Sequence, residues 1–162
     1  MEVRLARAGD ADATREIYNA EVSGSTVTFD MVPRTQTDQL AWLDAHSGSH
    51  AATVAVDRDG AVVGFASLSP YRSRPAYSTT VEDSVYVRSD QRGHGVGRIL
   101  LADLLERATS YGFHAVMARI VGGHEASIGL HRACGFDLIG VEREVGRKFG
   151  RWLDVALMER LL

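Results

Sequence analysis

The spacing of hydrophobic and polar residues along the chain predicts seven strands and four helices. Alternation of apolar and polar side chains, as in Met1-Glu2-Val3-Arg4-Leu5, is typical of a strand with one buried face. Apolar residues three or four positions apart, as at Ala13, Ile17 and Ala20, are typical of an amphipathic helix. Strands are expected over residues 1–5, Ala52–Val56, Ala61–Leu68, Thr79–Val87, His114–Ile120, Phe136–Glu144 and Trp152–Glu159. Helices are expected from Gly9-Asp10 onward and over Thr37–Ala45, Val96–Ala108 and Glu125–Ala133.

The order of these elements predicts a mixed α/β fold. Consecutive strands in the first half favour antiparallel pairing, and Asp57-Arg58-Asp59-Gly60 is a hairpin signal between two of them. The later strand–helix–strand unit favours one parallel pair. We therefore expect a mixed, mostly antiparallel central sheet with helices on both faces.

Composition narrows the class of protein. The 162 residues are 45% apolar, which suits one domain spanning residues 1–162 with a sizeable core. A net charge of −3 gives no general attraction to nucleic acid or to an anionic membrane surface. Cys134 is the only cysteine, which excludes a disulfide framework and a cysteine-based zinc site. No apolar run approaches the roughly 18 residues of a membrane helix, and the N-terminus lacks a signal-peptide pattern, so a reduced, soluble, cytoplasmic protein is expected.

The most informative segment is the glycine-rich turn that follows the strand ending at Val87. Gly93, Gly95 and Gly97 stand at alternate positions just before an apolar helix. Such a turn allows successive backbone N–H groups to converge on an anion, and the helix N-terminus adds its own unpaired donors. The pattern indicates a phosphate-bearing ligand, although a turn that only redirects the chain is the alternative. The spacing fits neither G-x-G-x-x-G nor G-x-x-x-x-G-K-[ST].

Several motifs in order carry a family resemblance over nearly the whole chain. Arg92-Gly93-His94-Gly95-Val96-Gly97 resembles the R-x-x-G-x-G/A acetyl-CoA signature of the GCN5-related N-acetyltransferases, the GNAT family. A second match runs from Ala126 to His131 and on to Gly135-Phe136. Residues 80–87 (TVEDSVYV) and 148–154 (KFGRWLD) resemble the branch that acetylates phosphinothricin and methionine sulfoximine. The resemblance implies a homodimeric N-acetyltransferase that uses acetyl-CoA and no metal, and acts on a small amino-acid-like amine.

The resemblance also implies how acetyl-CoA is held. The strand before the glycine turn pairs through its backbone with the pantetheine arm, and the turn wraps the pyrophosphate. Packing in the sheet is another role for Val85 and Val87, and it is compatible with this one. His124 stands where relatives usually carry asparagine against the pantetheine arm. The implied binding residues are Val85, Tyr86, Val87, Arg92, Gly93, His94, Gly95, Val96, Gly97, Arg98, His124 and Ser127.

Two residues are candidates for proton transfer. Glu82 shares a strand face with Ser84 and Tyr86, and a carboxylate in a β-branched strand is costly unless that face is wet or paired. A solvent-facing edge position is the plain interpretation, whereas the resemblance implies a general base. His131 occupies the place where many relatives carry a tyrosine that protonates the departing CoA thiolate. An acid, a polar clamp and a structural histidine all remain open for it.

The acceptor is expected to bind near the loop that precedes Glu82. Two arginines in that loop suit a carboxylate or phosphinate, although exposed arginines are often only solvated. The resemblance implies the acceptor-pocket residues Phe29, Arg72, Ser73, Arg74 and Tyr77. Cys134, at a helix end, favours packing over an acyl-enzyme, so direct transfer in a ternary complex is expected. The alternatives are an acceptor on a peptide or protein, a non-catalytic acyl-CoA sensor and a nucleotide-binding regulator.

Overall fold

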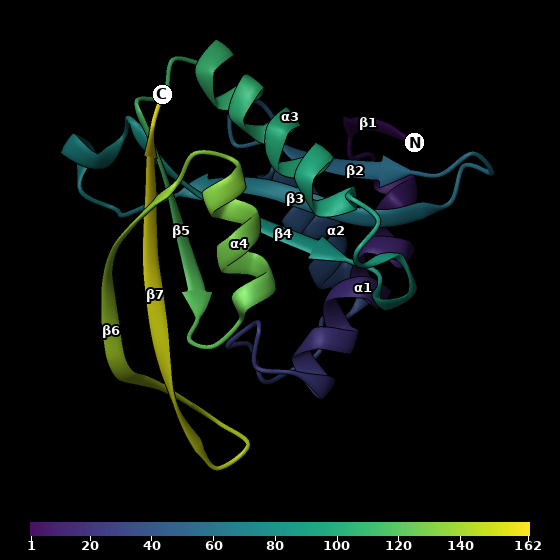
Figure 1. Cartoon of the computed structure of the whole chain (residues 1–162). Coiled ribbons are helices and arrows are strands. Elements are labelled where there is room, and N and C mark those ends of the chain that lie inside the picture. The colour runs from purple at the N-terminus through teal and green to yellow at the C-terminus, as the bar shows by residue number, and fades with distance from the viewer.

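The computed structural model describes all 162 residues and contains every predicted element in the predicted order (Figure 1). The strands are β1 Glu2–Leu5, β2 Ala52–Val56, β3 Val62–Pro70, β4 Thr80–Val87, β5 Ala115–Val121, β6 Asp137–Lys148 and β7 Arg151–Leu161. The helices are α1 Ala11–Gly24, α2 Gln36–Ala45, α3 Val96–Ser110 and α4 Glu125–Ala133. Gly9 and Asp10 lie in a short 3-10 turn rather than in α1, and β6 and β7 extend beyond their predicted ends. None of these helices combines the length and the apolar character needed to traverse a bilayer.

The strands form one sheet in the order β1-β2-β3-β4-β5-β7-β6, and only β4 and β5 are parallel. Their pairing stops early, because it covers only Thr80–Glu82 against Ala115–Met117. β4 nevertheless continues to Val87, where it is still paired with β3. Figure 1 shows the two parallel strands diverging beyond this point. From Asp83 to Val87, the edge of β4 that faces β5 therefore has no strand partner.

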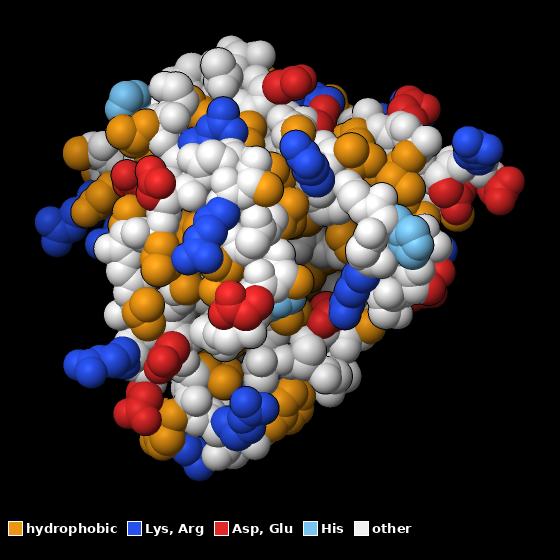
Figure 2. All heavy atoms as spheres, in the orientation of Figure 1, with side chains coloured by type: hydrophobic (Ala, Val, Ile, Leu, Met, Phe, Trp, Pro, Cys, Tyr) orange, Lys and Arg blue, Asp and Glu red, His pale blue; other side chains and the backbone are white.

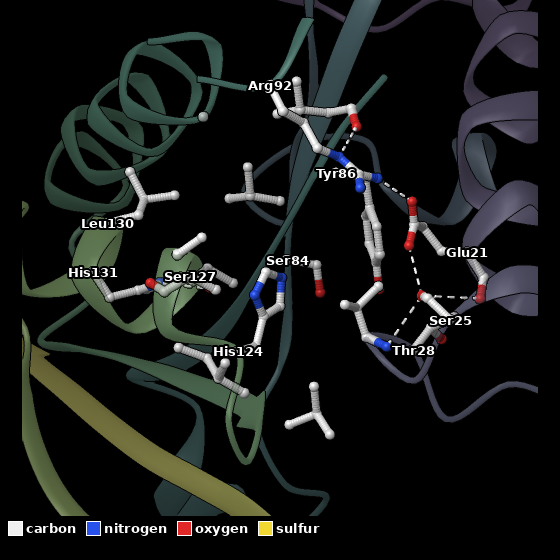
Figure 3. A pocket seen from close by; sticks show the side chains of 18 of the residues that line it. Glu21, Ser25, Thr28, Ser84, Tyr86, Arg92, His124, Ser127, Leu130 and His131 are labelled. Carbon is white, nitrogen blue, oxygen red and sulfur yellow. Dashed lines mark hydrogen bonds and ion pairs between the residues drawn. The ribbon is translucent and has the colours of Figure 1, made fainter. Parts of the chain in front are cut away.

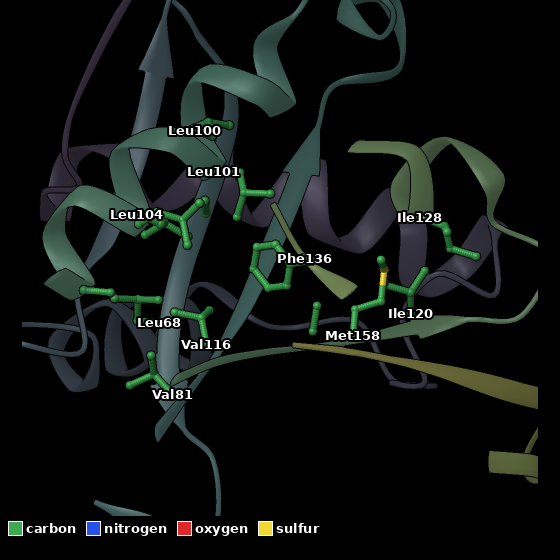
Figure 4. Packing of buried hydrophobic residues seen from close by; sticks show 14 of the residues in the cluster. Leu68, Val81, Leu100, Leu101, Leu104, Val116, Ile120, Ile128, Phe136 and Met158 are labelled. Atoms are coloured by element: carbon green, nitrogen blue, oxygen red, sulfur yellow. The ribbon is translucent and has the colours of Figure 1, made fainter. Parts of the chain in front are cut away.

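Helices cover both faces of the sheet, as the element order predicts. On one face, Leu100, Leu101 and Leu104 of α3 are fully buried in an 18-residue cluster that includes Val81 and Val116 of the sheet (Figure 4). Burial of each such leucine contributes about 1.5–3 kcal/mol. The other face packs a smaller cluster of Ile17, Tyr18 and Val22 from α1 with Val54, Val56 and Phe65. This packing fixes α3, and with it the glycine turn at its N-terminus, beside the free edge of β4.

Candidate active site

A cavity of about 650 Å³ opens where β4 and β5 separate. Its walls come from β4, β5, the glycine turn, α4, and α1 with the loop that follows it. Figure 2 shows this face of the molecule hollowed, with acidic and basic side chains at the rim. Figure 3 shows α4 residues on one side of the cavity and α1 residues on the other. The divergence of the two parallel strands therefore creates a site of the size that small-molecule sites have.

The glycine turn carries a row of unused hydrogen-bond donors beside this cavity. None of the five successive backbone N–H groups from Gly93 to Gly97 donates a hydrogen bond within the chain. Gly93 and Gly95 have φ values of +77° and +83°, which other residues rarely adopt. The row ends at the first turn of α3, whose N-terminus carries a partial positive charge. These donors and this charge can hold a phosphate group without any side chain.

Arg92 is already engaged across the cavity. Its guanidinium forms an ion pair with Glu21 of α1 and donates to the carbonyl of Val87 over 3.2 Å (Figure 3). The other carboxylate oxygen of Glu21 accepts a hydrogen bond from the Ser25 hydroxyl over 2.6 Å. Arg92 thus ties the glycine turn to α1. Arg98 lines the same cavity, whereas His94 is exposed and lies outside the lining residues.

The side chains at the free edge of β4 pack inside the protein. Val85 and Val87 contact the large cluster under α3, and Tyr86 stacks on Phe65 with 5.2 Å between ring centroids. Because these side chains have packing partners, the backbone is the part of this segment that remains available to a ligand. Both roles considered for Val85 and Val87 are therefore compatible with the geometry.

Glu82 is half-buried at the point where β4 and β5 part, and it lines the cavity. Burial raises the pKa of its carboxyl, the positive charge of Arg119 on β5 opposes this rise, and the negative charge of Asp83 adds to it. Arg119 itself forms an ion pair with Glu142 over 2.8 Å. A carboxylate with a raised pKa is a stronger base than an exposed one.

His131 and Asp83 form a buried pair in the cavity wall. His131 Nε2 lies 3.1 Å from Asp83 Oδ1, and Nδ1 lies 2.7 Å from the carbonyl oxygen of Ser127. Burial alone would lower the pKa of His131, but the hydrogen bond to Asp83 and its negative charge outweigh burial and raise it. His131 is thus neither solvent-facing nor a simple core residue.

His124 and Ser127 line the cavity from the start of α4. His124 is half-buried, and burial lowers its pKa, with a further contribution from the positive charge of Arg92. Its imidazole is therefore neutral at pH 7, as an asparagine side chain would be. Gly97 allows close packing of α3 on α4, because a Cβ there would lie 3.1 Å from Leu130 Cδ2.

The far wall of the cavity depends on contacts between the loop after α1 and β6. Phe29 lines the cavity, and its ring lies so close to Gly146 that a Cβ there would be 2.4 Å from Cε2. Lys148 is buried and donates from Nζ to the carbonyl of Thr28 over 2.9 Å. Burial lowers the pKa of Lys148. β6 thereby fixes the position of Phe29.

The structure does not bring the other predicted acceptor residues into this cavity. Arg72, Ser73, Arg74 and Tyr77 all lie outside its lining residues. Arg72 instead packs over the rings of Tyr71 and Tyr77, at 5.0 and 5.5 Å from their centroids. Cys134 also lies outside the cavity, and burial raises the pKa of its thiol. No group of three or more His, Cys, Asp or Glu side chains is gathered so that it could hold a metal.

Sequence reasoning missed three charged residues of the cavity: Glu21, Asp83 and Arg119. Asp83 had a usable signal, because it follows Glu82 directly and must point to the opposite face of the strand. A carboxylate on that inner face needs a buried partner. Glu21 and Arg119 carried no such signal, since their partners lie far away in the sequence.

The contact between Phe29 and Gly146 leads to a prediction about the cavity wall. We expect Gly146→Ala to displace the Phe29 ring and to lower the free energy of unfolding by about 1–3 kcal/mol, because overpacking forces neighbours to move. Urea unfolding measures this loss. Gly140→Ala is the matched control on the same strand, since nothing lies within 4 Å of its added Cβ. Adding Phe29→Ala should recover most of the loss, and a loss that persists in the double variant would contradict the proposed contact.

Comparison with known proteins shows the family of the chain. Residues 12–136 match the model of the Acetyltransferase (GNAT) family. An L-methionine sulfoximine/L-methionine sulfone acetyltransferase of Pseudomonas paraeruginosa is 42% identical over 97% of this chain and 92% of its own length. Among solved structures, a phosphinothricin acetyltransferase from Sinorhizobium meliloti in complex with acetyl-CoA is similar with a TM-score of 0.96. It is 40% identical, over 99% of this chain and 88% of that one.

A ribosomal-protein-alanine N-acetyltransferase from Brucella melitensis is also similar, with a TM-score of 0.97 and 38% identity over the whole of both chains. The family match covers most of the chain, and both the relative and the solved structures extend over nearly all of it. The expected fold and the expected use of acetyl-CoA are confirmed. The chain belongs to the GNAT family and is an acetyl-CoA-dependent N-acetyltransferase.

Proposed function

We propose that this enzyme acetylates the amine of a small amino-acid-like acceptor of the phosphinothricin or methionine sulfoximine type. The observation that carries the proposal is the position of Glu82. Its half-buried carboxylate lies in the same cavity as the free edge of β4 and the donors of the glycine turn. The names of the Pseudomonas and Sinorhizobium relatives support the acceptor class.

Acetyl-CoA binding follows from the free backbone groups. The unpaired edge of β4 from Asp83 to Val87 accommodates the amide-containing pantetheine arm as an added strand would. The N–H groups from Gly93 to Gly97, together with Arg98, hold the pyrophosphate. A backbone N–H of β4 then stabilises the oxygen of the thioester as negative charge develops on it. Held in this way, the thioester carbon is presented to an acceptor bound beside Glu82.

The reaction needs two proton transfers, and the cavity holds a group for each. An amino-acid amine is mostly protonated at neutral pH, so Glu82 first accepts a proton from it, directly or through a water. The free amine attacks the thioester carbon. The carbon–sulfur bond then breaks, and His131 protonates the sulfur of CoA. Per turnover, the ammonium loses two protons, one to the thiol product and one to solvent.

Transfer takes place directly between the two bound substrates. The only cysteine of the chain lies outside the cavity, and burial keeps its thiol protonated by raising its pKa. A protonated thiol remote from the thioester is a poor nucleophile. A ternary complex without an acyl-enzyme is therefore the mechanism that fits this arrangement.

A peptide or protein amine is the second candidate acceptor, favoured by the similarity to the Brucella protein. Arg72 and Arg74 favour the small acceptor, since a peptide has no free carboxylate beside its reacting amine.

These arginines do not reach the cavity of their own chain, so a role in acceptor binding requires a second copy. We propose a homodimer in which they enter the partner's cavity. Exposed apolar side chains on β6, β7 and their connection offer a surface for it: Leu138, Ile139, Val141, Val145, Phe149 and Trp152.

Glu82→Gln tests the general base. We expect kcat to fall by about 10²- to 10⁴-fold while the Kd for acetyl-CoA is unchanged, because the variant keeps the shape of the site and loses only the basic oxygen. Since only the ionised carboxylate accepts a proton, kcat/KM of the natural protein should fall as pH falls through the raised pKa of Glu82. Glu16→Gln, at an exposed position of α1, is the control. Unchanged turnover in Glu82→Gln would remove Glu82 as the base.

The acceptor class is tested by release of the CoA thiol from acetyl-CoA. We expect saturable release with phosphinothricin and methionine sulfoximine, because both present a carboxylate and an amine on one small molecule. Ordinary amino acids and short peptides complete the panel. Release with peptides alone would replace the small acceptor by a protein amine. Binding of acetyl-CoA without release on any acceptor would favour an acyl-CoA sensor.

Mixed dimers test whether the arginine loop acts across two copies. Glu82→Gln lacks the base, and the double variant Arg72→Ala/Arg74→Ala lacks the loop charges, so each should be inactive alone. Co-expression of the two should restore about a quarter of the natural activity, because half of random dimers are mixed and each mixed dimer has one intact site. Full activity of the arginine variant alone, or an inactive mixture, would contradict the arrangement.

A further inference from the structure

Asp83 and His131 are among the most buried charged or ionisable side chains of the cavity wall, at 6% and 3% exposure. Asp83 follows Glu82 on β4 and points to the opposite face, toward α4. Phe136 packs edge-on against the imidazole, with 5.0 Å between ring centroids. A charge in such surroundings is costly unless it is paired, so the two side chains depend on each other.

The hydrogen bonds of the imidazole show how many protons the pair holds. Nδ1 of His131 contacts the carbonyl oxygen of Ser127, which can only accept, so Nδ1 carries a proton. Nε2 contacts an oxygen of Asp83, which also only accepts when the carboxyl is ionised. A hydrogen bond at this second contact therefore needs another proton between Nε2 and Oδ1. The pair holds one proton more than a neutral imidazole beside a carboxylate.

A second observation indicates that the pair is not purely structural. Asp83 Oδ2 is buried and has no hydrogen-bond partner, although Asp83 lines the cavity. A purely structural pair would be expected to satisfy both carboxylate oxygens.

The other ionisable groups that interact electrostatically with Asp83 or His131 are Glu82 on β4, His124 at the start of α4 and Cys134 just after α4. Burial keeps His124 and Cys134 neutral, because it lowers the pKa of the first and raises the pKa of the second.

We propose that Asp83 is a positioning residue that keeps His131 doubly protonated, and that the proton on Nε2 is the one delivered to the sulfur of CoA. This inference rests on the proposed function and adds to it the source of the second proton. Nδ1–H is held by the carbonyl of Ser127, in the preceding turn of the same helix, whereas Nε2–H is shared with Asp83, which lines the cavity together with His131. We therefore assign the transferred proton to Nε2.

The transfer step balances without any other reactant. The carbon–sulfur bond breaks, its electron pair moves to sulfur, and the sulfur takes the Nε2 proton. His131 is left neutral, with the lone pair of Nε2 facing the carboxylate of Asp83. This contact is repulsive, and it favours rapid recapture of the second proton that the acceptor amine releases. The pair is thereby recharged for the next turnover.

Titration of His131 by NMR tests the proton count without any substrate. In the natural protein, His131 should remain protonated to a pH clearly above the usual value for histidine. In Asp83→Asn, which keeps the shape and removes the charge, it should lose its proton at least about one pH unit lower. His131→Gln assigns the signal, and Asp90→Asn, which loses an exposed partner of Arg88, is the matched control. A natural His131 that titrates at or below the usual value overturns the proposal, even if Asp83→Asn does not fold.

The pH profile of CoA release tests the acid role. Asp83→Asn should lose activity increasingly as pH rises, by about tenfold once its His131 is neutral, while its Kd for acetyl-CoA is unchanged. In a His131→Gln background, Asp83→Asn should have no further effect. If activity of Asp83→Asn falls at the same alkaline pH as activity of the natural protein, the role of Asp83 is overturned. If His131 titrates as expected but no acceptor is acetylated, the proposed function and the acid role are rejected together. The NMR titration by itself tests only the proton held by the pair.

Discussion

The early end of the pairing between β4 and β5 is the constraint on which the site depends. Three residue pairs hold these strands together, and beyond Glu82 the edge of β4 is left without a partner. β4 itself continues as a strand because β3 pairs with it to Val87. A parallel pair also requires a crossover connection, and here that connection is α3. The open strand edge and a helix N-terminus are consequently placed side by side by the same topology.

The alternation of side chains along β4 divides the chemistry between two layers of the protein. Glu82 and Asp83 are adjacent in sequence but project from opposite faces of the strand. Glu82 is influenced first by burial and then by Arg119 on the neighbouring strand, whereas Asp83 is paired with His131 on α4. A ligand bound along the strand edge lies between the two faces. In the proposed reaction, one short segment thus places a proton acceptor and a paired proton donor on either side of the same ligand.

Local patterns were sufficient to predict the fold and the place of the glycine turn at the N-terminus of α3. Apolar spacing predicted all the strands and helices in order, because each element buries one face or one stripe. The glycine turn could be interpreted because backbone donors depend only on local conformation. Contacts distant in sequence could not be predicted in this way. Asp83 and His131 are 48 residues apart, and Glu21 and Arg92 are 71 apart.

The arginine loop shows a different limit of sequence reasoning. Its closeness to Glu82 in the sequence suggested closeness to the cavity. In the structure the loop lies before the start of β4, whereas the cavity opens toward the end of that strand, so the strand direction separates them. The contact of Phe29 with Gly146 could not be predicted either, because nothing in the sequence indicates which glycine the ring of Phe29 packs against.

The unused N–H groups from Gly93 to Gly97 also connect ligand binding to the stability of the fold. Only the folded chain gathers them at the N-terminus of α3, beside the free edge of β4, where we propose that acetyl-CoA binds. A ligand that binds the folded state alone stabilises it by about 2.7 kcal/mol when its concentration is a hundred times its Kd. Acetyl-CoA bound at this turn would therefore lower the fraction of unfolded chain. In the proposed complex, the groups that hold the donor substrate thus also couple its binding to the stability of the fold.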